Sequence, residues 1–155
     1  MPQSTLIIGI GSPNADDQAG LRIAERLAVR APTGATVRIA DSPARLLDWL
    51  DGFDALVVCD AFHSADAVGT IRQWRWPADE IENSRFSGSH DMSLAAVLAL
   101  AERLDRLPSD VTIFGIAISD VRPIDELSPA VAEAIDEVVN QINRAIHVGQ
   151  AFQPD

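Results

Sequence analysis

One stretch of the sequence decides the fold class: residues 6–28, which read LIIGIGSPNADDQAGLRIAERLA. Its first part, residues 6–10, is a short apolar run beside glycines, which is typical of a buried strand. Polar residues follow, and from Leu21 onward apolar residues recur at helical spacing. The stretch therefore predicts a strand, a loop and a helix in succession.

The same alternation continues along the chain. Apolar runs predict further strands at residues 36–40, 55–59, 68–74 and 111–118. Helical spacing predicts a short helix over 44–50, a helix from Leu94 to Leu104 capped by Ser89 or Asp91, and a long final helix that begins at Ser128-Pro129. Residues 77–90 have no repeating period and are expected to form an irregular loop.

These elements predict an α/β fold. The near-continuous apolar runs indicate strands that are covered on both faces, as in parallel sheets. Too few residues separate 55–59 from 68–74 for a helical crossover, so the later strand is expected to pair antiparallel at an edge. The expected architecture is a three-layer αβα sandwich, with one mostly parallel sheet of about five strands and helices on both faces.

Length and composition limit the function classes. The 155 residues suit a single domain, expected over 1–148, with a frayed tail at 149–155. The 12 basic and 23 acidic residues give a net charge of −11, which argues against nucleic acid or an anionic membrane as partner. The one cysteine, Cys59, lies in an apolar run, and no secretory signal or membrane-spanning stretch is apparent, so we expect a cytoplasmic protein, monomeric or weakly oligomeric.

Acidic residues and a histidine fall near the predicted carboxyl ends of the strands, where open α/β sheets bind ligands. Asp16 and Asp17 follow the first strand, Asp60 follows the third, and His90 precedes a helix. Two carboxylates and an imidazole suit a divalent metal of borderline softness, with positions left for water or substrate, as metal-assisted hydrolysis requires. His63 is a further ligand or proton carrier to consider.

Each of these residues also has a simpler interpretation. Asp16 or Asp17 would serve as a cap of the first helix, and Asp60 as a cap of a turn. His90 and His63 would be solvated loop histidines. The metal-site hypothesis rests on the residues together rather than on any one of them.

A rival hypothesis is dinucleotide binding. Gly9 and Gly11 follow the first strand and Asp41 ends the second, as in a dinucleotide fingerprint. However, Asn14 stands where the third glycine would be, and the acids after it would repel a pyrophosphate at the helix start. This interpretation is the weaker one.

Four segments together resemble the hydrogenase maturation endopeptidases, which process the large subunit of nickel–iron hydrogenases. They are IIGIGSPNADDQAGLRIAERL (7–27), DALVVCDAFHSADAVGTI (54–71), SGSHDMSLAAVLALA (87–101) and FGIAISDVRPIDELSPAVAEAI (114–135), in the family's order and over nearly the whole chain. The family's metal-binding positions carry over to Asp17, Asp60 and His90. Ser12 stands where the family usually has Asn, and Gln18 replaces its common glycine.

The resemblance implies a function. It implies removal of a short C-terminal extension from the hydrogenase large-subunit precursor, with nickel already inserted in the precursor as the element recognised by Asp17, Asp60 and His90. Whether a metal-bound water attacks, or Asp17 or Asp16 acts as general base, is left open, as is a divalent metal in the resting protein. The alternative is a chaperone-like module that holds the immature large subunit without cutting it.

Overall fold

A mostly parallel sheet forms the middle layer of the protein. The computed structural model describes residues 4–83, 85–86, 92–119 and 127–147. Five strands follow one another across the sheet in the order β2-β1-β3-β6-β4. These strands are β1 (Thr5–Ile10), β2 (Ala35–Ala40), β3 (Ala55–His63), β4 (Ile71–Arg75) and β6 (Asp110–Ile118). The short strand β5 (Arg85–Phe86) pairs with the end of β3.

The pairing confirms the predicted arrangement of strands. β1 is parallel to both β2 and β3, and β3 is parallel to β6. β4 is antiparallel to β6 at the edge of the sheet. Every residue of β1 is buried, as expected for a strand that is covered on both faces.

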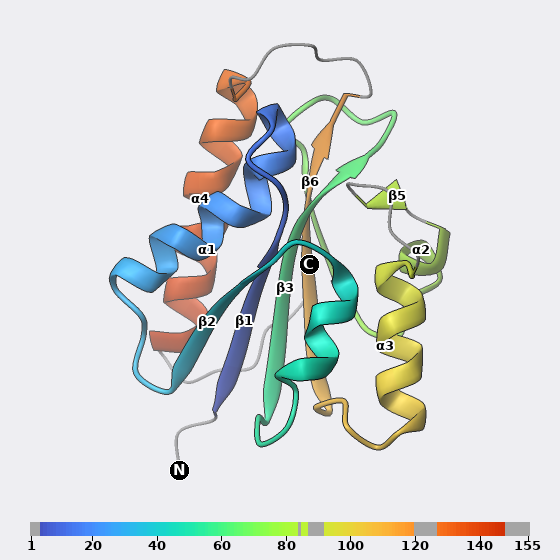
Figure 1. Cartoon of the computed structure of the whole chain (residues 1–155). Coiled ribbons are helices and arrows are strands. Elements are labelled where there is room, and N and C mark those ends of the chain that lie inside the picture. The colour runs from blue at the N-terminus through green and yellow to red at the C-terminus, as the bar shows by residue number, and fades with distance from the viewer. Residues whose placement is uncertain (1–3, 84, 87–91, 120–126, 148–155) are drawn as a thin grey trace.

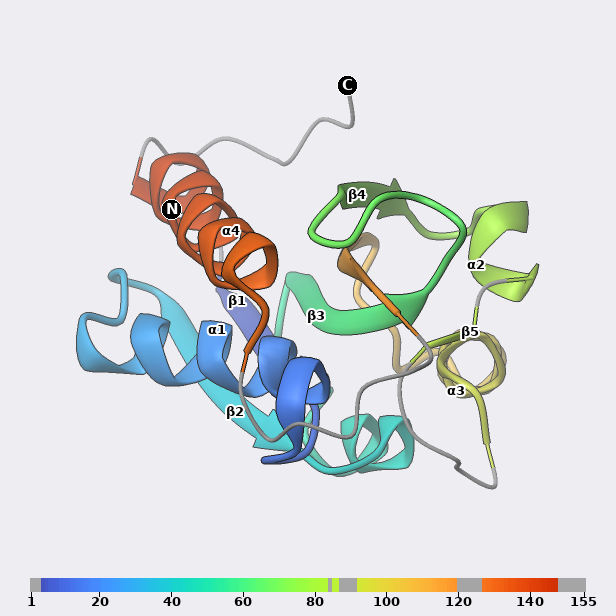
Figure 2. The ribbon, with the colours of Figure 1, turned by 90° about the horizontal axis from the view of Figure 1, so that it is seen from above.

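Helices cover both faces of the sheet, which makes the predicted three-layer sandwich. The α-helices are α1 (Ala19–Val29), α2 (Asp79–Asn83), α3 (Leu94–Arg103) and α4 (Pro129–His147), and the 3₁₀-helices are η1 (Ala15–Gln18) and η2 (Pro43–Asp48). α1 and α4 lie side by side on one face, whereas α3 lies on the other (Figures 1 and 2).

Each face of the sheet has its own hydrophobic core. Alternate residues of β3 divide between them, because successive side chains of a strand point to opposite faces: Val57 packs with α1 and α4, and Val58 packs with α3 and η2. α4 buries one stripe of residues at helical spacing, namely Val131, Ile135, Val138 and Ile142.

Three local predictions were wrong. Residues 77–90 contain α2 and β5 and are not irregular throughout. α3 is capped by Ser93, whose hydroxyl oxygen accepts from the Ala96 N–H, and not by Ser89 or Asp91. The edge strand begins at Ile71 rather than residue 68, because Gly69 has a positive φ of 92° and forms a turn there.

Two further predictions concern the C-terminal tail and the absence of a membrane-spanning stretch. The frayed tail predicted at 149–155 lies outside the described residues. Among the helices that are described, none is both long enough and apolar enough to cross a membrane.

Candidate functional site

The chain changes its direction of travel across the sheet between β1 and β3. From β1 it passes through α1 to β2 on one side, and from β2 through η2 to β3 on the other side of β1. In open α/β sheets, ligands bind beyond the carboxyl ends of the strands at such a point. The two predicted carboxylates belong to these strands, since Asp17 follows β1 and Asp60 lies in β3.

Asp17 is held by the loop that leaves β1. The Ser12 hydroxyl donates to Asp17 Oδ2 at 2.5 Å. The Asp17 N–H donates to the Asn14 carbonyl at 3.0 Å, and the Ser12 N–H donates to the Asp17 carbonyl at 3.2 Å. Asp17 is only partly buried, so its carboxylate combines a defined orientation with access to solvent.

Asp60 lies inside β3 and not on the connection after it, so the predicted end of this strand at Cys59 was wrong. Pairing with β6 continues through His63 and keeps the backbone extended. Pairing with β1 stops earlier, at Gly9 and Cys59. Asp60 is therefore the first residue of β3 beyond its ladder with β1, at the carboxyl end predicted for the site.

The Asp60 side chain is almost completely buried. It is 1% exposed, and its Oδ1 accepts from the Ala61 N–H at 2.8 Å. Strand alternation directs it to the face that also holds Val58 and Phe62, the face covered by α3. A buried carboxylate is costly unless polar groups satisfy it, so its presence here needs a structural or functional reason.

The elements that carry the two carboxylates are in contact. η1, which contains Asp17, packs against β3. The start of α1 also lies on these strands, because a Cβ atom on Gly20 would be 2.1 Å from the Ile10 carbonyl oxygen and 2.5 Å from that of Cys59. The fold thus brings Asp17 and Asp60 to one end of the β1–β3 pair.

The third predicted ligand, His90, lies outside the described residues. Within the described part of the chain, no group of three or more His, Cys, Asp and Glu side chains is arranged to hold a metal ion. The set of Asp17, Asp60 and His90 therefore stays a prediction.

His63 is not the loop histidine that the sequence suggested. It is the last residue of β3 and is half-buried. Because it is three residues after Asp60, strand alternation places the two side chains on opposite faces of the sheet. This arrangement argues against His63 as a ligand that shares a metal with Asp60.

Asp16 has a role that the sequence did not indicate. Its side chain is buried, with Oδ1 accepting from the Ser128 N–H at 2.8 Å and Oδ2 accepting from the Ser128 hydroxyl at 2.7 Å. Neither Asp16 nor Asp17 caps α1, whose N-cap residue is Gln18. The partners are 112 positions apart, so no local pattern in a single sequence could have revealed the pair.

Gly9, inside β1, and Gly11, just after it, allow the helical segments to pack closely against the strand. A Cβ atom on Gly9 would lie 2.1 Å from the Gly20 carbonyl oxygen, and one on Gly11 would lie 2.5 Å from the Asp17 carbonyl oxygen. η1 lies between β1 and α1, where the pyrophosphate of a dinucleotide would approach the helix start, and its acidic residues Asp16 and Asp17 would repel that group. The geometry therefore disfavours dinucleotide binding.

Cys59 belongs to the core, as predicted. It is fully buried in β3. Burial raises the pKa of its thiol far above the ordinary value, and the adjacent Asp60 carboxylate raises it further. A thiol that stays protonated in this way is a poor nucleophile.

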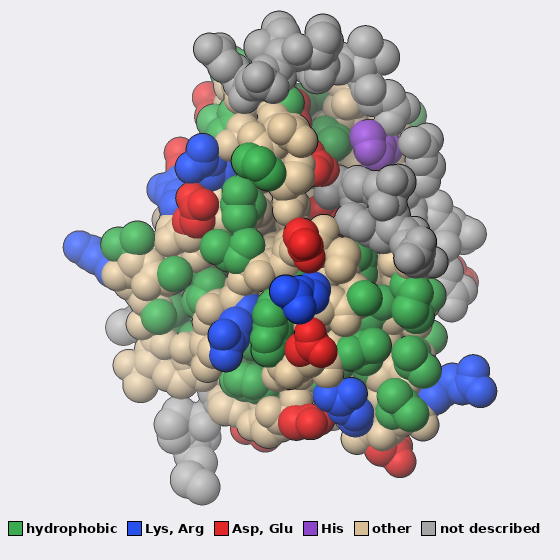
Figure 3. All heavy atoms as spheres, viewed as in Figure 1, with side chains coloured by type: hydrophobic (Ala, Val, Ile, Leu, Met, Phe, Trp, Pro, Cys, Tyr) green, Lys and Arg blue, Asp and Glu red, His purple; other side chains and the backbone are tan. Residues whose placement is uncertain are grey.

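The face formed by η2 and β2 carries charges of both signs. Figure 3 shows basic, acidic and hydrophobic side chains interspersed there. Arg38 and Arg45 lie over the ring of Trp49, at 5.5 and 6.0 Å from its centroid. Arg45 also pairs with Asp41 and Asp48. These partners offset the positive charge of Arg45.

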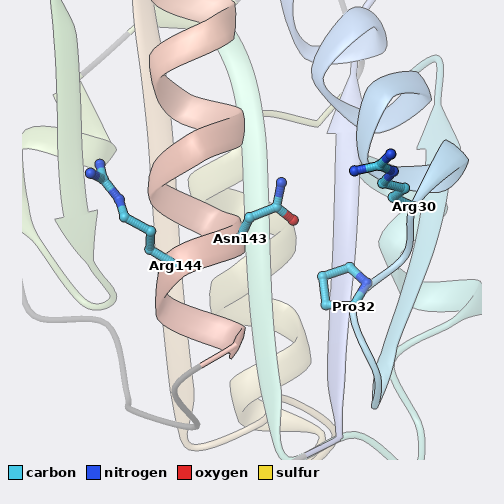
Figure 4. A pocket seen from close by; sticks show the side chains of 4 residues that line it. All are labelled: Arg30, Pro32, Asn143 and Arg144. Carbon is cyan, nitrogen blue, oxygen red and sulfur yellow. The ribbon is translucent and has the colours of Figure 1, made fainter.

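A surface pocket of about 370 Å³ lies away from the predicted site. It is lined by Arg30 and Pro32, which follow α1, and by Asn143 and Arg144 of α4. Figure 4 shows the Arg30 and Asn143 side chains facing each other, while Arg144 points away. Pro32 precedes β2, so the pocket lies toward the amino ends of the parallel strands, opposite Asp17 and Asp60.

Comparison with known proteins gives a consistent family. The family model HycI, hydrogenase maturation protease, matches residues 21–145, a range that includes positions 60 and 90 but begins after Asp17. The hydrogenase 2 maturation protease of Escherichia coli (strain K12) is 29% identical over 149 residues, which cover 91% of this chain and 89% of that protein.

Solved structures agree with this match. The hydrogenase maturating endopeptidase HybD from E. coli superposes with a TM-score of 0.75 at 25% identity, over 94% of this chain and 93% of that one. The [NiFe] hydrogenase maturation protease HybD from Thermococcus kodakarensis has a TM-score of 0.69 at 24% identity, over 92% and 99% of the two chains. The predicted fold and family are confirmed, and the chain belongs to the hydrogenase maturation protease family.

Proposed function

We propose that this protein cuts the C-terminal extension from the large-subunit precursor of a nickel–iron hydrogenase, and that it recognises nickel already inserted in that precursor. Membership of the hydrogenase maturation protease family supports the processing of a hydrogenase precursor. The observation that carries the finer proposal is that Asp17 and Asp60 lie at the same end of the sheet, the carboxyl ends of β1 and β3, on elements that are in contact.

The proposed site consists of Asp17, Asp60 and His90. Two carboxylates and an imidazole are suitable ligands for a divalent metal such as nickel, which here arrives as part of the substrate. Contact with that nickel would fix the precursor so that the scissile bond lies beside the site. Holding the reacting groups together in this way lowers the barrier by orientation, without a strong nucleophile.

Asp16 and Asp17 have different hydrogen-bond partners, which indicates different roles for the two acids. Both oxygens of Asp16 accept bonds from Ser128, and the side chain is buried. Asp17 has one described side-chain bond, from Ser12, and is only partly buried. Of the two, Asp17 is therefore the better candidate for a general base that takes a proton from the attacking water.

The decisive experiment incubates the purified protein with nickel-loaded and nickel-free precursor and reads the precursor mass by mass spectrometry. We expect loss of the extension from the loaded form alone. Cleavage of both forms would contradict nickel recognition. Binding of the loaded precursor at unchanged mass would contradict proteolysis and indicate a chaperone-like module instead.

Substitutions test the site itself. Asp17→Ala, Asp60→Asn and His90→Ala should each leave the loaded precursor uncut. Asp41→Asn is the matched control, because Asp41 follows β2 at the same end of the sheet and its side chain is 83% exposed. Normal cleavage by all three site variants would contradict the proposed site.

We further propose that the protein acts in the cytoplasm as a monomer or weak oligomer. The cytoplasmic location is supported by the single, buried cysteine, which suits a reducing compartment. Fractionation of the producing cells and the mass of the purified protein in solution test the two statements separately.

A further inference from the structure

The chain has two adjacent acids after β1 whose side chains go to different places. Ala15, just before them, adopts a positive φ of 45°, a backbone conformation that is uncommon for a residue other than glycine. Asp16 then turns into the protein and is 2% exposed, whereas Asp17 stays partly exposed beside Ser12. Backbone strain of this kind persists only where the surroundings hold it in place.

The surroundings that hold it are the beginning of α4. Ser128 donates to Asp16 through both its N–H and its hydroxyl, at 2.8 and 2.7 Å, and is itself 3% exposed. The Ser128 carbonyl accepts from the Ala132 N–H, so Ser128 is also part of the first turn of α4. The partial positive charge at a helix N-terminus favours the nearby Asp16 carboxylate.

α4, which provides Ser128, is well packed against the rest of the protein. It is 19 residues long and buries a continuous apolar stripe against α1 and the sheet. η1 is only four residues long and follows a loop. The Asp16–Ser128 pair therefore connects the short segment that carries Asp17 to α4, the longest of the described helices.

We infer that Asp16 and Ser128 are positioning residues, and that their pair fixes η1 so that the adjacent Asp17 carboxylate faces the substrate. This inference rests on the proposed function, because it assigns to the pair a part in precursor cleavage. Loss of the pair lowers the rate of cleavage through Asp17, since small displacements of a reacting group cost large factors in rate. It leaves precursor binding by the rest of the surface unchanged.

The test compares Ser128→Ala, which removes one of the two bonds, with Ser128→Thr, which keeps a hydroxyl. Ile142→Val is the stability control. Ile142 is fully buried, and its position 14 residues further along α4 places it about 21 Å from Ser128. It should lower Tm by about 2–4 °C without contact with η1.

The readouts are the single-turnover cleavage rate at saturating protein, the Kd for nickel-loaded precursor, and Tm. We expect Ser128→Ala to cut about tenfold more slowly, with Kd weakened by less than that factor because Asp60, His90 and the rest of the surface still bind the precursor. Ser128→Thr should restore most of the rate, and Ile142→Val should cut at the normal rate with the normal Kd. Amide hydrogen exchange should be faster at Ser12 and Asp17 in Ser128→Ala alone, because both N–H groups bond within the loop and η1.

Two results would overturn the inference while the proposed function stands. One is cleavage at the normal rate by Ser128→Ala, and the other is an equal loss of rate in Ile142→Val, which would reduce the effect to stability. A wild-type protein that leaves the loaded precursor uncut would instead contradict the proposed function and the inference with it.

Discussion

A Cβ atom on Gly9 would lie 2.1 Å from the carbonyl oxygen of Gly20, so β1 and α1 touch through their backbones. The same atom would lie 2.7 Å from the Ala24 Cβ, one helical turn further on. This contact holds the start of α1 against β1. Because η1 directly precedes α1, the contact also restricts the position of η1 and of Asp17. The two glycines act on the site through packing.

The close contact predicts a large loss of stability on substitution. Gly9→Ala should lower the free energy of unfolding by about 3 kcal/mol or more, because the backbone of α1 must move to admit the methyl group. Gly52→Ala is the control: Gly52 has a positive φ of 90° but nothing within 4 Å of a Cβ, so only the backbone cost of about 1 kcal/mol applies. Urea denaturation followed by circular dichroism measures both, and equal losses would contradict the packing role.

A second prediction concerns nucleotides. NAD or NADP at millimolar concentration should leave Tm unchanged, because the acidic residues of η1 would repel a pyrophosphate at the turn after β1. A thermal-shift titration is sufficient. A rise in Tm that Asp41→Ala abolishes would restore the dinucleotide hypothesis.

Much of the fold was predictable, because its signals are local. The apolar runs of β1 and β3 and the helical stripe of α4 each appear within about twenty residues of sequence. The end of β3 was misplaced, since Asp60 interrupts its apolar run while pairing with β6 continues to His63. The end of β3 is therefore set by its pairing with β6, a tertiary interaction that the local apolar pattern does not show.

The arrangement of the candidate site was predictable only in part, because some of its contacts are tertiary and leave no local signal in the sequence. A parallel sheet brings the carboxyl ends of its strands to one edge, which was enough to predict that Asp17 and Asp60 lie at the same end of β1 and β3. The bond between Asp16 and Ser128 depends instead on how α4 returns to η1 over 112 positions. Strand alternation shows that His63 faces away from Asp60, but only once the strand is known to extend that far.

Cys59 provides a prediction on pH. Burial and the Asp60 carboxylate raise the thiol pKa in the folded protein above its ordinary value of 9.0. Above about pH 9 the unfolded chain loses this proton while the folded protein keeps it, so stability falls as pH rises. Relative to Cys59→Ala, the decline should approach about 1.4 kcal/mol per pH unit.

Urea denaturation of both proteins between pH 7 and 11 measures this difference. In the same experiments, a thiol reagent should modify Cys59 only in denaturant. Rapid modification of the folded protein at pH 8 would show that the thiol is accessible, contrary to its burial.

The last prediction concerns Ser12, whose hydroxyl donates to Asp17 Oδ2 at 2.5 Å. A hydrogen bond to a charged group is among the stronger ones in proteins, and here it selects one orientation of the carboxylate. Under the proposed function, Ser12→Ala should slow cleavage of nickel-loaded precursor about tenfold, and Ser12→Thr should retain most of the rate. Ser4→Ala is the matched control, because the Ser4 hydroxyl also closes a loop contact, to the Gly52 carbonyl at 3.3 Å, but at the amino end of β1. Single-turnover assays with Tm measured in parallel separate orientation from stability: equal rates for Ser12→Ala and Ser4→Ala would show that the Ser12 bond does not orient Asp17 for the reaction.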